Sequence, residues 1–172
     1  MRAVGGVCRV AVIADTHLRD APPWRDLPAE AWRRIRRSDV ILHAGDVLDE
    51  GILRRFEDAV PTHAVLGNND VDLVGRLPLT LELELAGVRV AMIHDSKNRA
   101  DRARRMSRRF PDADLVVFGH SHIPWNDVGE RGQVLFNPGS PTTRRAQPTH
   151  TMGELELAEG RIIRRRLIDL GR

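Results

Sequence analysis

Apolar runs of strand length alternate along this chain with stretches of helical spacing. Val7 to Ala14 and Asp39 to His43 are short apolar runs that predict buried strands. Between them, Pro28 to Arg37 has helical spacing and opens with proline, which is favoured in the first helical turn. Two more helices are predicted, at Leu48 to Ala59 and at the arginine-rich stretch Lys97 to Phe110. This alternation predicts an α/β layered fold.

The remaining strands are predicted from shorter patterns. The alternation of Leu with Thr or Glu from Leu79 to Leu85 predicts a strand with one solvated face. Near the end of the chain, Glu159-Gly160 separates two strand-like runs and predicts an antiparallel hairpin. Besides the Leu79 to Leu85 strand, the pattern predicts strands at residues 62–66, 88–93, 114–118, 133–136, 151–157 and 161–168.

Length and composition indicate one soluble domain over residues 1–172. The chain is 41% hydrophobic, yet no apolar run approaches the roughly 20 residues that span a membrane, so we expect no membrane segment. Cys8 is the only cysteine, which excludes an internal disulfide and favours a reducing, cytoplasmic location. The leucine-rich face of Leu79 to Leu85 is a candidate surface for a homo-oligomer.

Arginine dominates the positive charge. Lys97 is the only lysine among 27 basic residues, and the net charge is only +3 because 24 acidic residues oppose them. Arginines cluster in three runs, at Arg33 to Arg37, at Arg99 to Arg109 and at Arg161 to Arg166. These runs could contact the phosphates of a nucleic acid. The near balance of charge favours the alternative, in which they are solvated faces.

The most informative feature is a set of polar side chains that each lie at or near the end of an apolar run. Carboxylate, imidazole and amide oxygen suit Mn, Fe or Zn. Loops that leave the carboxyl ends of strands gather in one place in open layered sheets, so we expect these donors to meet and form a two-metal centre. The predicted ligands are Asp15, His17, Asp46, Asn68, His94, His120 and His122.

Each ligand segment alone has an ordinary structural explanation. Asp15-Thr16-His17 could be a helix cap or a turn, and Gly45-Asp46 is a common turn dipeptide. His94 alone is more typical of a core histidine. Only the joint occurrence of five segments in this order favours the metal site. In extended segments, the period of two would place Asp15 and His17 on one side, and likewise His120 and His122.

Together these segments resemble the calcineurin-like metallophosphoesterase superfamily, whose signature runs Asp-x-His, Gly-Asp, Gly-Asn-His-Asp/Glu, a lone His and Gly-His-x-His. The short chain and Asn137-Pro138-Gly139-Ser140 are similar to its small phosphodiesterases and to the related retromer subunit. This resemblance implies a four-layer αββα sandwich of two mixed β-sheets flanked by helices. It also implies two divalent ions, manganese in the first place and iron, zinc or nickel as alternatives.

The resemblance further assigns the ligands. It implies that Asp15, His17 and His122 bind the first metal, that Asn68, His94 and His120 bind the second, and that Asp46 bridges both. A water between two such ions loses its proton near neutral pH and attacks phosphorus in line, so the protein itself need not supply a nucleophile.

Two positions depart from the family pattern. Asn69 stands where the phosphomonoesterases carry a histidine that protonates the leaving group, and an amide cannot donate that proton. This departure favours diesters or good leaving groups, with Asn69 and Asp70 as candidate catalytic residues and a ligand-orienting role for Asp70 as the alternative. Asp95 stands where the family commonly has glycine, and its carboxylate could bond an imidazole, narrow the pocket or alter substrate choice.

Three function classes follow from the sequence. The first is a metal-dependent phosphodiesterase for a small phosphoester, which the complete ligand set favours. The second is a binding or scaffold protein on the same fold, as in the retromer subunit. The third is a nuclease or nucleic-acid binder that uses the arginine runs, which is less favoured because those runs have the solvated alternative.

Overall fold

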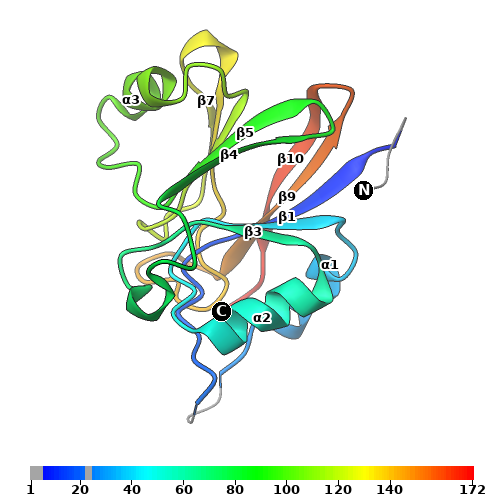
Figure 1. Cartoon of the computed structure of the whole chain (residues 1–172), viewed down its shortest axis with the longest axis vertical. Helices are drawn as coiled ribbons and strands as arrows, with labels where there is room; N and C mark the ends of the chain where they lie inside the picture. The colour runs from blue at the N-terminus through cyan, green and yellow to red at the C-terminus, as the bar shows by residue number, and fades with distance from the viewer. Residues whose placement is uncertain (1–5, 22–24) are drawn as a thin grey trace.

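The computed structural model describes residues 6–21 and 25–172, and within them two five-stranded sheets pack face to face (Figure 1). The first sheet has the order β10-β9-β1-β2-β3, and the second has the order β4-β5-β6-β8-β7. Helices α1 (Ala29–Ile35) and α2 (Glu50–Ala59) cover the first sheet, and α3 (Arg102–Arg109) covers the second. The predicted four-layer αββα arrangement of two mixed sheets is confirmed.

The first sheet combines a parallel centre with an antiparallel edge. Strands β1 (Cys8–Ile13), β2 (Val40–His43) and β3 (Thr62–Ala64) run parallel. Strands β9 (Thr151–Ala158) and β10 (Arg161–Asp169) form the predicted hairpin, in which Arg161 pairs with Ala158 across the turn. Glu159 and Gly160 in that turn have φ values of 49° and 72°, as a tight two-residue hairpin turn requires.

The second sheet has a parallel centre of its own. Strands β5 (Val88–Ile93), β6 (Leu115–Val117) and β8 (Val134–Asn137) run parallel, and β4 (Thr80–Leu85) and β7 (Trp125–Val128) pair antiparallel at the two edges. Strand β7 was not predicted. Its sequence, Trp-Asn-Asp-Val, has one half-buried and three exposed residues and therefore lacks an apolar pattern.

Alternation within the strands builds three layers of core. Val10 and Val12 of β1 face the second sheet, whereas Ala11 and Ile13 face the helices α1 and α2. Both faces of β1 are therefore buried, which explains why its sequence reads as a continuous apolar run. A third cluster, which includes Met106 of α3, packs the helix on the outer face of the second sheet.

Two of the predicted helices begin later than the sequence pattern suggested. Helix α2 begins at Glu50, because Leu48 has a φ of 82° and the Asp49 side chain accepts the N–H groups of Gly51 and Ile52 as the N-cap. Helix α3 begins at Arg102 instead of Lys97.

The segment before α3 is an irregular loop held by side chains. The Arg105 guanidinium donates to the carbonyl oxygens of Ser96, Asn98 and Ala100, at 2.7 to 3.3 Å. Lys97 and Asp101 have φ values of 66° and 56°, which are incompatible with a right-handed helix. The arginine-rich composition thus marked a real helix, but one of its arginines binds the loop that the pattern had included in the helix.

The strand at Leu79 to Leu85 has the alternation that the sequence predicted. Glu82 and Glu84 are exposed, while Leu81, Leu83 and Leu85 pack against the core between the sheets. Of the leucines in this segment, Leu79 remains open to solvent, at 72% exposure. No helix among residues 6–21 and 25–172 is long and apolar enough to cross a bilayer.

Candidate metal centre

The predicted ligand segments lie where parallel strands of both sheets end. Asp15 follows β1, Asp46 follows β2, and Asn68 follows β3 in the first sheet. His94 follows β5, and the segment from His120 to His122 follows β6, in the second sheet. Parallel strands have their carboxyl ends at one edge, so the packing of the two sheets brings all five segments to a common site.

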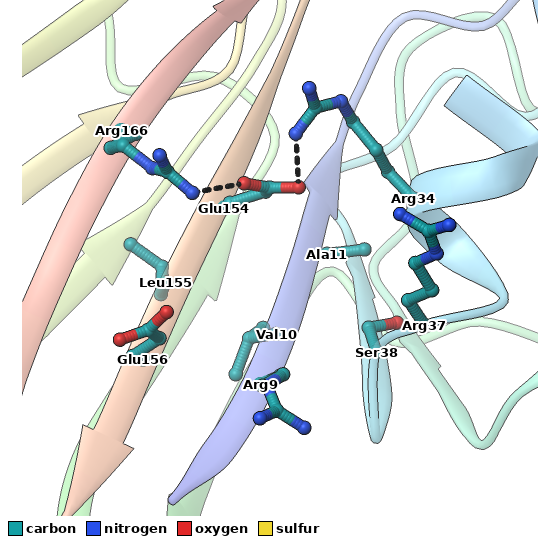
Figure 2. Close-up of a pocket in the computed structure, with 10 residues that line it drawn as sticks. All are labelled: Arg9, Val10, Ala11, Arg34, Arg37, Ser38, Glu154, Leu155, Glu156 and Arg166. Carbon is teal, nitrogen blue, oxygen red and sulfur yellow. Dashed lines mark hydrogen bonds and ion pairs between the residues drawn. The ribbon is translucent and has the colours of Figure 1, made fainter. Parts of the chain in front are cut away.

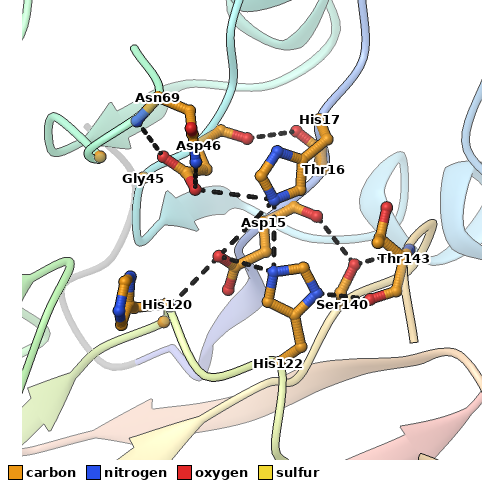
Figure 3. A network of polar contacts seen from close by, with 12 residues as sticks. Asp15, Thr16, His17, Gly45, Asp46, Asn69, His120, His122, Ser140 and Thr143 are labelled. Atoms are coloured by element: carbon orange, nitrogen blue, oxygen red, sulfur yellow. Dashed lines mark hydrogen bonds and ion pairs between the residues drawn. The ribbon is translucent and has the colours of Figure 1, made fainter. Parts of the chain in front are cut away.

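The seven predicted ligands form one continuous set of contacts, part of which is drawn in Figure 3. Donor atoms of Asp15, His17 and His122 lie within 4.8 Å of one another, and so do those of Asp15, Asp46 and His94. Asn68 joins this set through its side-chain oxygen, which lies 3.1 Å from His94 Nε2 and 2.9 Å from His120 Nδ1. Asp15 thus belongs to both groups, and Asp46 lies between histidines from both sheets.

The ligand pairs do not converge by the period of two that the sequence suggested. Asp15 and His17 have φ values of 54° and 46°, and His120 and His122 have φ values of 68° and 59°. All four are in the left-handed region, which non-glycine residues seldom adopt. The expectation of extended segments was therefore wrong here. Such a conformation costs on the order of 1 kcal/mol or more per residue and is typical of functional sites whose surroundings enforce it.

Backbone hydrogen bonds hold the first two ligand loops together. The N–H of Asp15 donates to Gly45 O at 2.9 Å, and the N–H of His17 donates to Asp46 O at 3.0 Å. The third ligand loop, which follows β3, approaches the second so closely that it requires glycine. A Cβ on Gly67 would lie 2.2 Å from both the backbone nitrogen and the Oδ1 atom of Asp46. A side chain at this position would displace the Asp46 carboxylate.

Hydrogen bonds also fix which nitrogen of each buried histidine faces the site. His94 Nδ1–H donates to Ala44 O at 2.7 Å, and His122 Nδ1–H donates to Thr143 O. The Nε2 atom of each ring therefore presents a lone pair. His94 Nε2 lies 3.5 Å from Asp46 Oδ2, and His122 Nε2 lies 3.4 Å from Asp15 Oδ1. Lone pairs that face carboxylate oxygens in this way suit a cation between them.

Asp15 provides the sharpest test of whether a cation fits. Its side chain is fully buried, and its Oδ2 atom has no hydrogen-bond partner among the residues that the structure describes. Burial raises the pKa of the Asp15 carboxyl to about 7, and the neighbouring Asp46 carboxylate adds to the rise. A buried carboxylate oxygen without a donor is costly unless a metal ion coordinates it. The site therefore fits a divalent cation at Asp15.

Although burial opposes it, contacts with Asp46 and the charge of Asp15 raise the pKa of His94. The pKa shifts of Asp46, His122 and His17 match a metal site. Although burial opposes it, contacts with His94 and the N–H groups of Asn69 hold the pKa of Asp46 well below its usual value. Burial lowers the pKa of His122 to about 4, and burial also lowers the pKa of His17, with the charge of Arg145 adding to both effects. Ionised aspartate and neutral histidine are the forms that bind metal.

Asn69, a predicted catalytic residue, contacts the Asp46 carboxylate directly. Its backbone N–H donates to Oδ1 at 2.9 Å, and its side-chain Nδ2 donates to Oδ2 at 2.7 Å. Asn69 is exposed, so its side chain lies at the mouth of the site.

Asp70, the second predicted catalytic residue, lies behind the site. Its Oδ2 accepts the N–H groups of Asp46 and Gly67, at 2.9 and 2.7 Å, and its Oδ1 accepts the N–H of Leu48 at 2.7 Å. The residue is 1% exposed. These contacts match the ligand-orienting alternative, because the carboxylate holds the loops that carry Asp46 and Asn68.

His43 and Asp95 contact other groups than the ligands. His43 Nδ1 accepts the N–H of Gly45 at 3.2 Å, and its Nε2 donates to Thr16 Oγ1 at 3.1 Å. His43 therefore stabilises the two loops that carry Asp15 and Asp46. Asp95 binds Lys97 through the backbone nitrogen at 2.7 Å and through Nζ at 2.8 Å. Its carboxylate is therefore engaged by Lys97.

The end of β8 and the segment that follows it anchor the site, which the sequence indicated only as a turn. Asn137 is fully buried, and its Nδ2 donates to Gly119 O at 2.9 Å. Ser140 Oγ donates to Asp15 O at 2.8 Å, and Thr142 Oγ1 donates to Thr16 O. The Asn-Pro-Gly-Ser sequence was the available signal, but it did not indicate these contacts, and those of Ser140 and Thr142 join residues more than 100 positions apart.

A pocket of about 390 Å³ adjoins the metal-site residues. His17, Thr142 and Thr143 line it on the side of the site, and Arg25 and His150 line it farther out. Its volume lies within the range of about 300 to 1,000 Å³ that is typical of small-molecule sites.

Comparisons with known proteins agree with this geometry. Residues 8–160 match the family model described as the calcineurin-like phosphoesterase superfamily domain. A probable metallophosphoesterase of Methanocaldococcus jannaschii is 35% identical over 145 residues, which cover 83% of this chain and 72% of that protein.

Solved structures share the fold at lower identity. Vacuolar protein sorting 29 from Cryptosporidium parvum superposes with a TM-score of 0.75 at 15% identity, over 96% of this chain and 99% of that one. Wild-type Vps29 from Entamoeba histolytica complexed with zinc superposes with a TM-score of 0.69 at 17% identity, over 95% of this chain and 99% of that one.

Proposed function

The chain belongs to the calcineurin-like phosphoesterase superfamily, and from this membership we propose that it is a phosphodiesterase that depends on two divalent metal ions. The observation that carries the proposal is the buried Oδ2 atom of Asp15, which has no hydrogen-bond partner in the described part of the chain and lies among histidine and carboxylate donors. When bound, the two ions supply an activated water as nucleophile and stabilise the charge on the phosphoryl oxygens.

The ligand assignment is part of the proposal. Asp15, His17 and His122 form one group whose donor atoms already lie together, and we assign them to the first ion. Asn68, His94 and His120 are joined by the Asn68 oxygen, and we assign them to the second. Asp46 Oδ2 lies 3.6 Å from His17 Nε2 and 3.5 Å from His94 Nε2, a position between the two groups that suits a bridging carboxylate.

Manganese is the proposed resident metal, with iron, zinc or nickel as alternatives. Mixed nitrogen and oxygen donors accept all four ions, so the donor set alone does not select one. The zinc in the Entamoeba histolytica structure supports the capacity of this fold to hold a transition metal.

The residues around the ions define the substrate class. Two divalent ions carry four positive charges and Asp15 and Asp46 supply two negative ones, so the loaded site favours an anion. Asn69 lies beside Asp46 and can donate a hydrogen bond to a phosphoryl oxygen, but it cannot protonate a poor leaving group. These properties favour a small phosphodiester, and the pocket beside His17 offers space for one of its ester groups.

The test is hydrolysis of bis(p-nitrophenyl) phosphate with added Mn²⁺, compared between the parent and Asp46→Asn. We expect the substitution to lower the rate at least 100-fold, because the amide lacks the charge that binds both ions. Equal rates in parent and variant would contradict the proposed phosphodiesterase activity. They would favour a scaffold role on this fold, as the Vps29 likeness allows. Metal analysis of both proteins is the control, with two ions per chain expected in the parent.

The nucleic-acid alternative has its own test. If the arginine runs track a phosphate backbone, the affinity for DNA or RNA falls steeply between low and moderate salt. Absence of a detectable complex at low salt would exclude this alternative.

A further inference from the structure

A groove of about 470 Å³ lies on the first sheet, remote from the metal-site residues (Figure 2). It lies near the start of β1 and just before β2, where Arg9 and Arg37 are found, whereas the ligand loops follow the other ends of these strands. The outer face of β9 forms the opposite wall through Glu154 and Glu156. Ala11 contributes only a methyl group to the floor. The groove exists because α1 covers β1 and β2 but leaves β9 open.

Two of the three arginine runs meet at this groove. Arg34 of the first run and Arg166 of the last run both contact the Glu154 carboxylate, at 2.8 and 3.0 Å. The two runs are more than 100 residues apart in the sequence. Glu154 therefore ties α1 to β10 and fixes the walls of the groove in place.

Two further arginines of the groove, Arg9 and Arg37, have guanidinium groups that are available to a ligand. The guanidinium groups of Arg9 and Arg37 make no ion pair or side-chain hydrogen bond with any residue in the described part of the chain. Both residues are exposed. Four arginines line the groove against two glutamates, so it carries a net excess of two positive charges. An excess of unpaired guanidinium groups in a concave site favours phosphate.

The other lining groups restrict the ligand further. No aromatic side chain is among the lining residues, so base stacking contributes nothing to affinity. Glu156 lies beside Arg164 at 3.4 Å, a distance that leaves its carboxylate able to accept hydrogen bonds from a ligand. A carboxylate beside two free arginines matches a molecule that carries both phosphate and hydroxyl or amino donors. The volume is that of a typical small-molecule site.

We propose that this groove binds a small phosphorylated metabolite with hydroxyl or amino groups, of the nucleotide or sugar phosphate class. Its phosphate contacts Arg9 and Arg37, and its hydrogen-bond donors contact Glu156. The site is separate from the metal centre and does not depend on the proposed hydrolysis.

The test is calorimetric titration of the full chain with ADP and with glucose 6-phosphate, both with Mn²⁺ and with EDTA. We expect saturable binding of at least one of the two in both conditions, and at least tenfold weaker binding in the double variant Arg9→Gln, Arg37→Gln. The matched control is Arg104→Gln, Arg108→Gln on α3, which removes equal charge elsewhere and should bind within twofold of the parent.

A second variant separates recognition of the whole ligand from simple attraction of an anion. Glu156→Gln should lower the affinity for whichever of ADP and glucose 6-phosphate binds at least fivefold. It should leave the affinity for pyrophosphate unchanged or higher. Three results would overturn the proposal: no saturable binding of ADP or glucose 6-phosphate, equal affinity in the Arg9 and Arg37 double variant, or tighter ligand binding by Glu156→Gln. The unfolding temperatures of all variants serve as the check on folding. Arg9 and Arg37 make no ion pair with residues 6–21 or 25–172 whose loss would lower these temperatures.

Discussion

The Asp70 carboxylate accepts the backbone N–H of Asp46 at 2.9 Å, so an acidic residue that could act on substrate is instead buried behind a proposed metal ligand. It also binds the N–H groups of Gly67 and Leu48. The same side chain thereby fixes two loops that follow neighbouring strands. We propose that its role is to position Asp46, because its hydrogen bonds in the described part of the chain all go to backbone groups.

Replacement of Asp70 by Asn should therefore act through metal binding and stability. Three backbone N–H groups share the two oxygens of Asp70, and an amide retains only one acceptor oxygen, so at least one buried N–H loses its partner. The free energy of unfolding should fall by about 2 kcal/mol. Metal affinity should fall on the order of 10- to 100-fold, as for other residues that orient ligands.

Denaturant unfolding and metal titration measure these two effects. The exposed Asp72→Asn is the matched control and should change neither quantity. A variant that keeps its metal affinity but loses activity with saturating metal would contradict the positioning role and would restore Asp70 as a catalytic residue.

Asn69→His tests the departure from the family pattern. A histidine here would add a proton donor at the mouth of the site, where Asn69 now contacts Asp46. General acid catalysis contributes typically about 10²- to 10⁴-fold, and it matters most for poor leaving groups. We expect the ratio of monoester to diester hydrolysis to rise about 100-fold with little change in metal content. An unchanged ratio would indicate that substrate geometry, and not the missing proton, sets the preference.

Much of the fold could be predicted because burial of a strand produces a recognisable pattern of apolar residues in the sequence. Both faces of β1 are buried, so Val10 to Ile13 read as a strand, and the leucines of β4 alternate because one face is solvated. The sequence of strand β7 has no such pattern. Its residues Asn126, Asp127 and Val128 are exposed, and backbone pairing with β8 alone defines the strand.

For the site, too, features encoded by neighbouring residues could be predicted, whereas features that depend on contacts distant in the sequence could not. The ligand types and their order along the chain are local, and they were sufficient to predict which segments would meet. Asp15 and His122 are left-handed, and they contact Gly45, Thr143 and Ser140, which come from other parts of the chain. A single sequence contains no periodic signal for such contacts, so the period of two gave the wrong backbone for these loops.

His43 makes stability depend on pH in the metal-free protein. Burial lowers the pKa of its imidazole to about 3, against 6.5 in the unfolded chain, so the folded state holds it neutral. Between these values the unfolded state binds more protons, and stability therefore rises with pH. The contribution of His43 to the free energy of unfolding is complete above pH 6.5. It is lost as the pH falls toward 3, at up to about 1.4 kcal/mol per pH unit.

Unfolding at several pH values in EDTA measures this contribution. His43→Gln should reduce the slope between pH 4 and 6.5, and because all other groups are shared, the difference between the two slopes isolates His43. Identical slopes in the two proteins would show that His43 accepts a proton in the folded state as readily as in the unfolded chain.

Asp95→Gly should change substrate preference without loss of metal. The Asp95 carboxylate engages Lys97, and the substitution removes its negative charge near His120 while freeing the Lys97 ammonium. Both changes make the mouth of the site more positive, so doubly charged monoesters should gain severalfold over diesters. Metal analysis should give the parent value. Unchanged relative rates across a panel of phosphoesters would contradict a role for Asp95 in selectivity.

Arg145→Ala should weaken substrate binding more than it slows the reaction. Arg145 is exposed on the loop whose Thr143 carbonyl binds His122, and its charge is close enough to contribute to the lowered pKa of His17 and His122, in each case after burial. A guanidinium in this position attracts the phosphoester in the ground state and the transition state alike, which raises affinity without lowering the barrier between them. We expect KM for bis(p-nitrophenyl) phosphate to rise about tenfold and kcat to stay within threefold. The control Arg108→Ala, on α3, should leave both constants unchanged. An equal loss of kcat and kcat/KM in Arg145→Ala would instead show that this arginine stabilises only the transition state.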